Sequence, residues 1–276
     1  MPPRIELLLI DPEVDFCEEG SNPLFVKGAD KDMSRLAKMI RRYLRFWCNI
    51  HVTQDAHRRF DVGHPVFWVD GRGQHPKPFT FFDHGDVRKG KWRPAAESLL
   101  ERMEKYDEAI EASNRYPISV WCEHCLIGSP GMNIVAELFA AVSEWEIEKK
   151  TKWVDYVIKG SNPYTEHYSA VMAEVPDRED ISTQINTKLI KTLKEADLVL
   201  VAGEAGSHCL ANTVRDIANQ FGDDTFVQKL MLIEDATSPV SNFEKEQDEF
   251  IQEMVQRNNG NGMQITTTDK FDPRKI

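Results

Sequence analysis

One cysteine occupies a position where sequence patterns predict a reactive thiol. The run from Leu198 to Ala202 is entirely apolar and predicts a buried parallel strand. Gly203 and Gly206 then permit a tight turn, and the apolar residues that follow Cys209 recur at helical spacing. A cysteine at a helix N-terminus has a lowered pKa, and the N–H groups of such a turn could form an oxyanion hole. The alternative is an inert cysteine buried beneath the turn.

Three more chemically useful residues follow predicted strands. Asp11 comes directly after an apolar run, and Asp55 and Lys159 each follow another short predicted strand. Because ligands bind at the carboxyl ends of the strands in open α/β sheets, we expect these residues to meet Cys209 there. Asp11 could then accept the thiol proton, and Lys159 could stabilise the thiolate and a developing oxyanion. A strand-end carboxylate could equally cap nearby N–H groups.

A second group of residues has the chemistry of a metal site. Asp55 and His57 come from one strand end, and His64 and His124 come from separate loops. One carboxylate and up to three imidazoles suit a divalent transition metal and leave room for water or substrate. His64 and His124 could equally be ordinary loop histidines. The pair Cys122-x-x-Cys125 could form a redox or zinc motif, but the sequence offers no second pair.

Composition limits the classes of partner. The chain has 276 residues, of which 41% are hydrophobic and 29% charged, as in an ordinary globular protein. A formal net charge of −11 argues against nucleic acids and anionic membranes as partners. No apolar run approaches the roughly 18 residues that a membrane span requires. Five cysteines and an N-terminus without the layout of a signal peptide predict a cytoplasmic protein with reduced thiols.

The order of predicted elements indicates an α/β fold. Strands are predicted at about 5–10, 49–54, 118–121, 154–158, 198–202 and 226–233. Helices are predicted at 32–47, from about 128 to 145, at 185–193, from 209 onward and around 250–255. Their alternation predicts a parallel sheet with helices on both faces, within a single domain spanning residues 1–276. Residues 60–116 read as an insertion or lid that carries a helix at about 95–106.

Five motifs resemble those of the nicotinamidases, in the isochorismatase-like cysteine hydrolase superfamily. Asp11–Cys17 is similar to D-x-Q-N-D-F-C, Gln54–His57 to Q/R-D-W-H, and Trp121–Cys125 to W-P-x-H-C. Lys159-Gly160 with Tyr168–Ala170 is similar to K-G…Y-S-A/G, and Gly203–Cys209 to G-x-A-x-x-x-C. Glu13, Val14 and Ala56 depart from these patterns, and Asp61 rivals His64 as the additional metal ligand.

The resemblance implies both a fold and a site. The fold is a three-layer α/β/α structure with a mostly parallel six-stranded sheet in the order 3-2-1-4-5-6. The implied catalytic residues are Asp11, Lys159 and Cys209. The oxyanion would be bound by the N–H groups of Ala205 and Cys209, with a cis peptide between Glu204 and Ala205. The implied substrate-binding residues are Phe16, Trp121 and Tyr168, and the implied metal ligands are Asp55, His57, His64 and His124.

The activity that the resemblance implies is hydrolysis of nicotinamide to nicotinate and ammonia through a thioester on Cys209, in NAD salvage. One divalent metal ion would be bound, with zinc first and iron or manganese as alternatives. The partner is then a small-molecule amide, and homo-oligomer formation stays open. Two other functions are compatible with the sequence: a related cysteine amidase for ureido or carbamoyl substrates, and a non-catalytic binding protein on the same fold.

Overall fold

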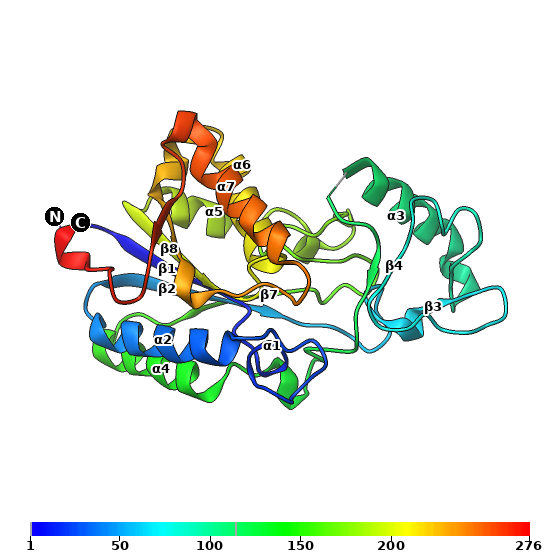
Figure 1. Ribbon diagram of the computed structural model, residues 1–276, viewed down its shortest axis with the longest axis horizontal. Helices are drawn as coiled ribbons and strands as arrows, with labels where there is room; N and C mark the ends of the chain where they lie inside the picture. The colour runs from blue at the N-terminus through cyan, green and yellow to red at the C-terminus, as the bar shows by residue number, and fades with distance from the viewer. Residues whose placement is uncertain (1, 114) are drawn as a thin grey trace.

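The computed structural model describes residues 2–113 and 115–276, and it is built around a six-stranded parallel sheet (Figure 1). Its strands are β1 (Ile5–Ile10), β2 (Trp47–Asp55), β7 (Asp155–Lys159), β8 (Leu198–Gly203), β9 (Leu230–Ile233) and β10 (Gln264–Thr266). They lie in the order β10-β9-β8-β1-β2-β7. Counted along the chain, this is the predicted order 3-2-1-4-5-6. The predicted fold is therefore confirmed.

Helices cover both faces of the sheet (Figure 1). One layer contains α1 (Val14–Cys17), α2 (Ala29–Arg42) and α4 (Ala136–Lys149). The other contains α5 (Thr187–Lys194), α6 (Cys209–Phe221) and α7 (Glu244–Gly260). β1 and β8 at the centre are buried along their whole length, which explains why their sequences are apolar runs rather than alternating patterns. None of the helices in the described parts of the chain is long and apolar enough to cross a membrane.

A glycine brings the two central strands into close contact at the edge that carries the candidate site. Ile10 of β1 pairs with Gly203 of β8. A Cβ atom on Gly203 would lie 2.1 Å from the carbonyl oxygen of Ile10, and the φ angle of +111° also favours glycine. The glycine at this position therefore lets the turn before α6 approach the end of β1.

Several predicted boundaries are wrong for identifiable physical reasons. The helix predicted at 32–47 ends at Arg42, and Trp47 begins β2 instead, where its buried ring stacks on Phe271. This contact with the C-terminal tail is invisible to local periodicity. The predicted strand at 118–121 is reduced to β6 (Ser119–Val120), which pairs antiparallel with β4 (Thr80–Phe81) outside the main sheet. The sixth strand comes from the tail as β10.

Three further predicted boundaries differ from the observed ones by four to eight residues. The helix predicted from about residue 128 begins at Ala136, after a 3₁₀ turn at Pro130–Met132. The first half of the strand predicted at 226–233 lies in a 3₁₀ turn, Asp224–Lys229. In the insertion, α3 spans Leu100–Ser113 rather than about 95–106. Periodicity located these elements but not their ends.

The insertion forms a lobe with an apolar core of its own, to the right in Figure 1. It contains α3, the paired strands β3 (Trp68–Val69) and β5 (Arg93–Pro94), and β4. Its buried core residues are Val62, Phe67, Trp68, Phe82, Val87, Met103, Tyr106, Ile110, Ile118 and Val120. Strands β4 and β6 join the lobe to the segment that leads into Trp121 and His124. The lobe is therefore attached directly to the candidate site.

A partly buried ion pair links the edge strand β7 to β2, and its effect on stability can be measured. Nδ1 of His51 lies 2.9 Å from the carboxylate of Asp155, and this contact lowers the pKa of Asp155 to about 2. Because the pKa falls on folding, the carboxylate stabilises the fold above its unfolded pKa near 3.8, and this contribution is lost as the pH falls from there through 2.

We therefore expect Asp155→Asn to lower the free energy of unfolding by about 1–2 kcal/mol near pH 6, since the carboxylate is partly exposed and its full shift is not realised. Urea unfolding of both proteins measures the difference, which should shrink as the pH falls below 3.8. Asp269→Asn is the matched control, because Asp269 is 86% exposed in its pair with Arg42. An equal loss in both variants would contradict the role of the His51–Asp155 pair.

Candidate active site

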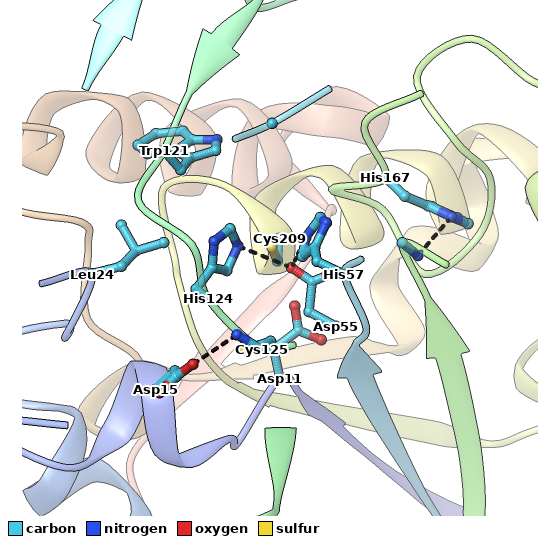
Figure 2. Close-up of polar contacts among 12 residues, drawn as sticks. Asp11, Asp15, Leu24, Asp55, His57, Trp121, His124, Cys125, His167 and Cys209 are labelled. Carbon is cyan, nitrogen blue, oxygen red and sulfur yellow. Dashed lines mark hydrogen bonds and ion pairs between the residues drawn. The ribbon is translucent and has the colours of Figure 1, made fainter. Parts of the chain in front are cut away.

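Four side chains from four elements meet at the carboxyl edge of the sheet, and Figure 2 shows three of them, Asp11, Asp55 and Cys209. Asp11 follows β1, Asp55 ends β2, Lys159 ends β7 and Cys209 begins α6. The Lys159 Nζ atom lies 2.9 Å from Oδ2 of Asp11, 3.2 Å from Oδ1 of Asp55 and 3.6 Å from Sγ of Cys209. All four residues are buried. The structure thus brings together the residues that the strand-end argument placed at one edge.

Asp11 is held by its neighbour on β2. The hydroxyl group of Thr53 donates to Oδ1 of Asp11 at 2.5 Å and accepts the backbone N–H of Asp11 at 3.0 Å. These bonds turn Oδ2 of Asp11 toward Lys159. Asp11 also has a φ angle of +42°, which is uncommon for a residue other than glycine. The carboxylate is therefore fixed in one orientation before any substrate arrives.

Burial is the largest single influence on the pKa values of Cys209, Asp11 and Lys159. It raises the pKa of the Cys209 thiol well above the usual range, and the charge of Lys159 opposes it. Burial also raises the pKa of Asp11, again opposed by Lys159. Burial lowers the pKa of Lys159, but attraction to Asp11 and Asp55 outweighs this effect and raises it well above the usual range. In the free protein the thiol therefore keeps its proton, contrary to the lowered pKa expected from the helix N-terminus alone.

The turn before α6 presents free N–H groups beside the thiol. Among residues 2–113 and 115–276, the backbone N–H groups of Ala205 and Cys209 donate to no acceptor. The peptide between Glu204 and Ala205 is cis, as the resemblance implied. Two unpaired donors next to a nucleophile have the arrangement that binds a developing oxyanion.

Asp55, His57 and His124 place potential metal-binding atoms within 4.8 Å of one another. Oδ2 of Asp55 lies 3.0 Å from Nε2 of His57 and 3.6 Å from Nε2 of His124, and Figure 2 shows the three groups converging. Two ligands at about 2.1 Å from one ion are roughly 3.0–3.4 Å apart in octahedral or tetrahedral geometry. The spacing of these donors therefore fits one small divalent cation.

The surroundings also favour a cation at this place. Nδ1 of His57 lies 3.2 Å from Oδ2 of Asp61, so a second carboxylate orients the ring from behind. Nδ1 of His124 is bonded to the carbonyl oxygen of Cys122 at 2.8 Å, which leaves Nε2 to face Asp55. Such partners are typical of metal-binding histidines. A second cluster, Asp11, Asp55 and Cys209, is less suited to a cation because the ammonium of Lys159 already lies among its atoms.

His64 lies beside the three-residue cluster rather than within it. Its Nε2 is 3.4 Å from Nδ1 of His124, on the side of that ring away from Asp55, and its Nδ1 lies 3.1 Å from the carbonyl oxygen of Arg58. Burial lowers the pKa of His64 to about 3, so its imidazole is neutral. The rival Asp61 contacts His57 instead. In this geometry neither His64 nor Asp61 belongs to the three-residue cluster, and each contacts one of its histidines instead.

The three residues expected to bind substrate line a cavity of about 400 Å³ that ends at Cys209. Phe16 packs against His124 with 5.5 Å between ring centroids, and the indole N–H of Trp121 donates to the hydroxyl group of Tyr168 at 3.1 Å. Aromatic walls with a few polar groups are typical of small-molecule sites.

Two residues of this cavity were missed at the level of the sequence. Glu166 lines it, and burial raises the pKa of its carboxyl group to about 7. His208 also lines it, and burial lowers the pKa of its imidazole to about 3. The position of His208 next to Cys209 was a usable signal. Glu166 offered none, because its loop folds back by long-range contacts such as the bond from its N–H to the hydroxyl group of Tyr106.

The Cys122-x-x-Cys125 pair takes no part in a metal cluster within the described residues. Both cysteines are buried free thiols. The backbone N–H of Cys125 donates to the carboxylate of Asp15 at 2.7 Å, which fixes the loop that carries His124 (Figure 2). In this structure the segment positions His124.

The same arrangement of elements occurs in solved structures. The yeast nicotinamidase superposes with a TM-score of 0.62 at 18% identity, over 95% of this chain and 99% of that one. A nicotinamidase/pyrazinamidase from Acinetobacter baumanii gives 0.62 at 19% identity, over 98% of each chain. The chain has the nicotinamidase fold.

A third similar structure, the pyrazinamidase of Pyrococcus horikoshii in complex with zinc, gives a TM-score of 0.56 at 17% identity, over 96% of this chain and 99% of that one. No protein-family model matches the sequence, and no curated protein matches it. Likeness to nicotinamidases at such low identity is a likeness of fold, so the chemistry must be argued from this chain's own residues.

The division between ligands and supporting residues leads to a binding prediction. We expect His124→Ala to abolish stoichiometric zinc binding, because it removes one of three converging donors. His64→Ala should keep the stoichiometry and lower the affinity by about 10-fold, as loss of a supporting group does. Competition with a chromophoric chelator measures both. If His64→Ala loses zinc as completely as His124→Ala, His64 is a ligand and the four-residue set expected from the sequence is correct.

Proposed function

We propose that this protein is a metal-dependent cysteine amidohydrolase that converts nicotinamide to nicotinate and ammonia. The observation that carries the proposal is that a nucleophile, a proton acceptor and a cation donor set adjoin one another at one cavity. Lys159 contacts both Cys209 Sγ and Asp11, and Asp55 and His124 of the donor cluster line the same cavity as Cys209. The alternative of an inert buried cysteine explains neither the buried lysine nor the free N–H groups beside it.

In the first step Asp11 accepts the proton of Cys209 as the sulfur attacks the carboxamide carbon. The C–S bond forms while the carbonyl π electrons move to oxygen, and the N–H groups of Ala205 and Cys209 bind that oxyanion. The ammonium of Lys159 offsets the negative charge shared by Asp11 and the sulfur. The raised pKa of Asp11 suits it to hold this proton for a short time.

The second step returns the same proton. The tetrahedral intermediate collapses, the C–N bond breaks, and Asp11 protonates the departing nitrogen to release ammonia. A thioester between Cys209 and the acyl group remains. Asp11, again a carboxylate, takes a proton from water as the water oxygen attacks the thioester. The C–S bond then breaks, Asp11 returns the proton to the sulfur, and the carboxylic acid leaves.

The ring of the substrate would be bound by the walls of the cavity. Phe16 and Trp121 offer flat apolar surfaces, and Tyr168 supports the indole through its hydroxyl group. A divalent ion held by Asp55, His57 and His124 would supply a Lewis-acid anchor for the pyridine nitrogen. Zinc suits this mixed oxygen and nitrogen donor set, as iron and manganese also do.

The cellular role that follows from this reaction is NAD salvage, since nicotinate and nicotinamide are pyridine precursors. All five cysteines are free thiols, which supports a reducing compartment such as the cytoplasm. An uncharged aromatic amide is also compatible with an acidic protein, because its binding does not depend on long-range electrostatic attraction.

The test is release of ammonia from nicotinamide by the purified, zinc-loaded protein. We expect a chelator to abolish turnover and added zinc to restore it. Cys209→Ala should lower the rate by roughly 10³-fold or more, because Cys209 is the only thiol among the described residues that line the cavity. Cys48→Ala, a thiol outside the cavity, is the control and should keep full activity.

Other outcomes distinguish the remaining functions. No release from a folded, zinc-loaded sample that hydrolyses ureido or carbamoyl compounds would make the protein a related cysteine amidase. A Cys209 thiol that resists alkylating reagents, with no amide hydrolysed, would indicate a binding protein. Near-normal activity in Cys209→Ala would overturn the proposed nucleophile.

A further inference from the structure

A second, larger cleft adjoins the candidate catalytic cavity. Leu24 and Val240 line both spaces, so the cleft lies directly beside the cavity. It has a volume of about 780 Å³ including its open mouth. Its lining residues are Pro23, Leu24, Phe25, Phe79, Phe81, Val240, Ser241, Asn242 and Phe243. A molecule the size of nicotinamide would leave this cleft empty when its carboxamide reaches Cys209.

Aromatic rings run without interruption from the cavity into the cleft. Phe79 and Phe81 meet Trp121 edge to face, with centroid distances of 6.1 and 5.8 Å. Phe81 also lies 5.9 Å from Phe243, whose ring lies 4.8 Å from that of His208 beside the nucleophile. These are geometries in which aromatic groups attract one another. A flat ligand group could extend this row.

The two phenylalanines are held in place although they are exposed. Phe79 and Phe81 are 43% and 41% exposed, whereas most large apolar side chains around them are buried. The N–H of Phe79 donates to the carbonyl oxygen of Val120 at 2.6 Å, and Thr80 pairs with Val120 in the β4–β6 ladder. The lobe thus presents a fixed apolar surface at the mouth of the site, and such surfaces mark places where a ligand binds.

The side chains that line the cleft limit the class of ligand that it can bind. None of the nine residues of the cleft carries an ionisable side chain, so nothing there would pair with a phosphate or a carboxylate. The few polar groups come from Ser241 and Asn242 at one side. The cleft is therefore suited to an uncharged, flat apolar group and not to a nucleotide.

We propose that this cleft is a second substrate subsite, which binds an uncharged aromatic or apolar group attached to the carboxamide that reaches Cys209. The proposal rests on the amidohydrolase function and specifies its substrate class: amides larger than nicotinamide. Such a group could be carried by the acyl part or by the leaving amine. Either attachment would use the same apolar contacts, and substrates extended on one side or the other distinguish the two.

The test compares nicotinamide with 5-phenylnicotinamide, which extends the acyl part, and N-benzylnicotinamide, which extends the amine. We expect kcat/KM for one of the two to exceed that for nicotinamide by about 10-fold, since burial of a phenyl group in an apolar cleft is worth at least that factor. Phe81→Ala should remove this advantage and change nicotinamide turnover by less than about 3-fold. Phe139 is an exposed phenylalanine on α4, and Phe139→Ala should leave kcat/KM for both substrates unchanged.

If nicotinamide is hydrolysed and neither extended amide is preferred, or if Phe81→Ala leaves the preference unchanged, the subsite is refuted while the amidohydrolase stands. If no amide is hydrolysed, the proposed function fails, and binding affinities measured by calorimetry then test the subsite. Zinc-loaded Cys209→Ala protein should then bind one extended amide about 10-fold more tightly than nicotinamide, and Phe81→Ala should abolish the difference. Equal binding in all cases overturns the proposal.

Discussion

The buried ammonium of Lys159 is the group on which the rest of the site depends. It lies between the carboxylates of Asp11 and Asp55, and a charge taken out of water is tolerated only when such partners compensate it. The same ammonium lies within 3.6 Å of Cys209 Sγ. Because Asp11 adjoins the thiol and Asp55 adjoins His57 and His124, one lysine links the candidate nucleophile to the candidate metal site. Its removal would leave the buried carboxylate of Asp11 without the cation that faces it.

That arrangement requires a parallel sheet with closely packed central strands. Asp11, Asp55 and Lys159 are spread over more than a hundred residues of sequence, yet each stands at the carboxyl end of its strand. The contact between Gly203 and Ile10 then allows the turn before α6 to bring Cys209 to the same edge. The helices on both faces cover the strands that carry these residues (Figure 1). Fold and chemistry are therefore coupled, since charges this deeply buried need fixed neighbours.

The lobe formed by the insertion adds residues to the site that the sheet and its helices do not supply. Its core is separate from that of the sheet, but β4 and β6 connect it to the segment that bears Trp121 and His124. It contributes a supporting histidine to the candidate metal site and two exposed phenylalanines to the entrance. An insertion of this kind alters which molecules reach the nucleophile without altering the nucleophile, which is how one fold serves several substrates.

The sequence by itself determined the α/β class and the strand ends that carry Asp11, Asp55, Lys159 and Cys209, because buried strands and helices have local periods that can be read directly. The resemblance added the strand order. Only the tertiary structure decided that β10 rather than residues 118–121 completes the sheet, that His64 stands beside the donor cluster, and that Glu166 enters the cavity. Each of these depends on contacts between segments far apart in the chain, such as Trp47 with Phe271 or Glu166 with Tyr106. Local patterns contain no information about such contacts.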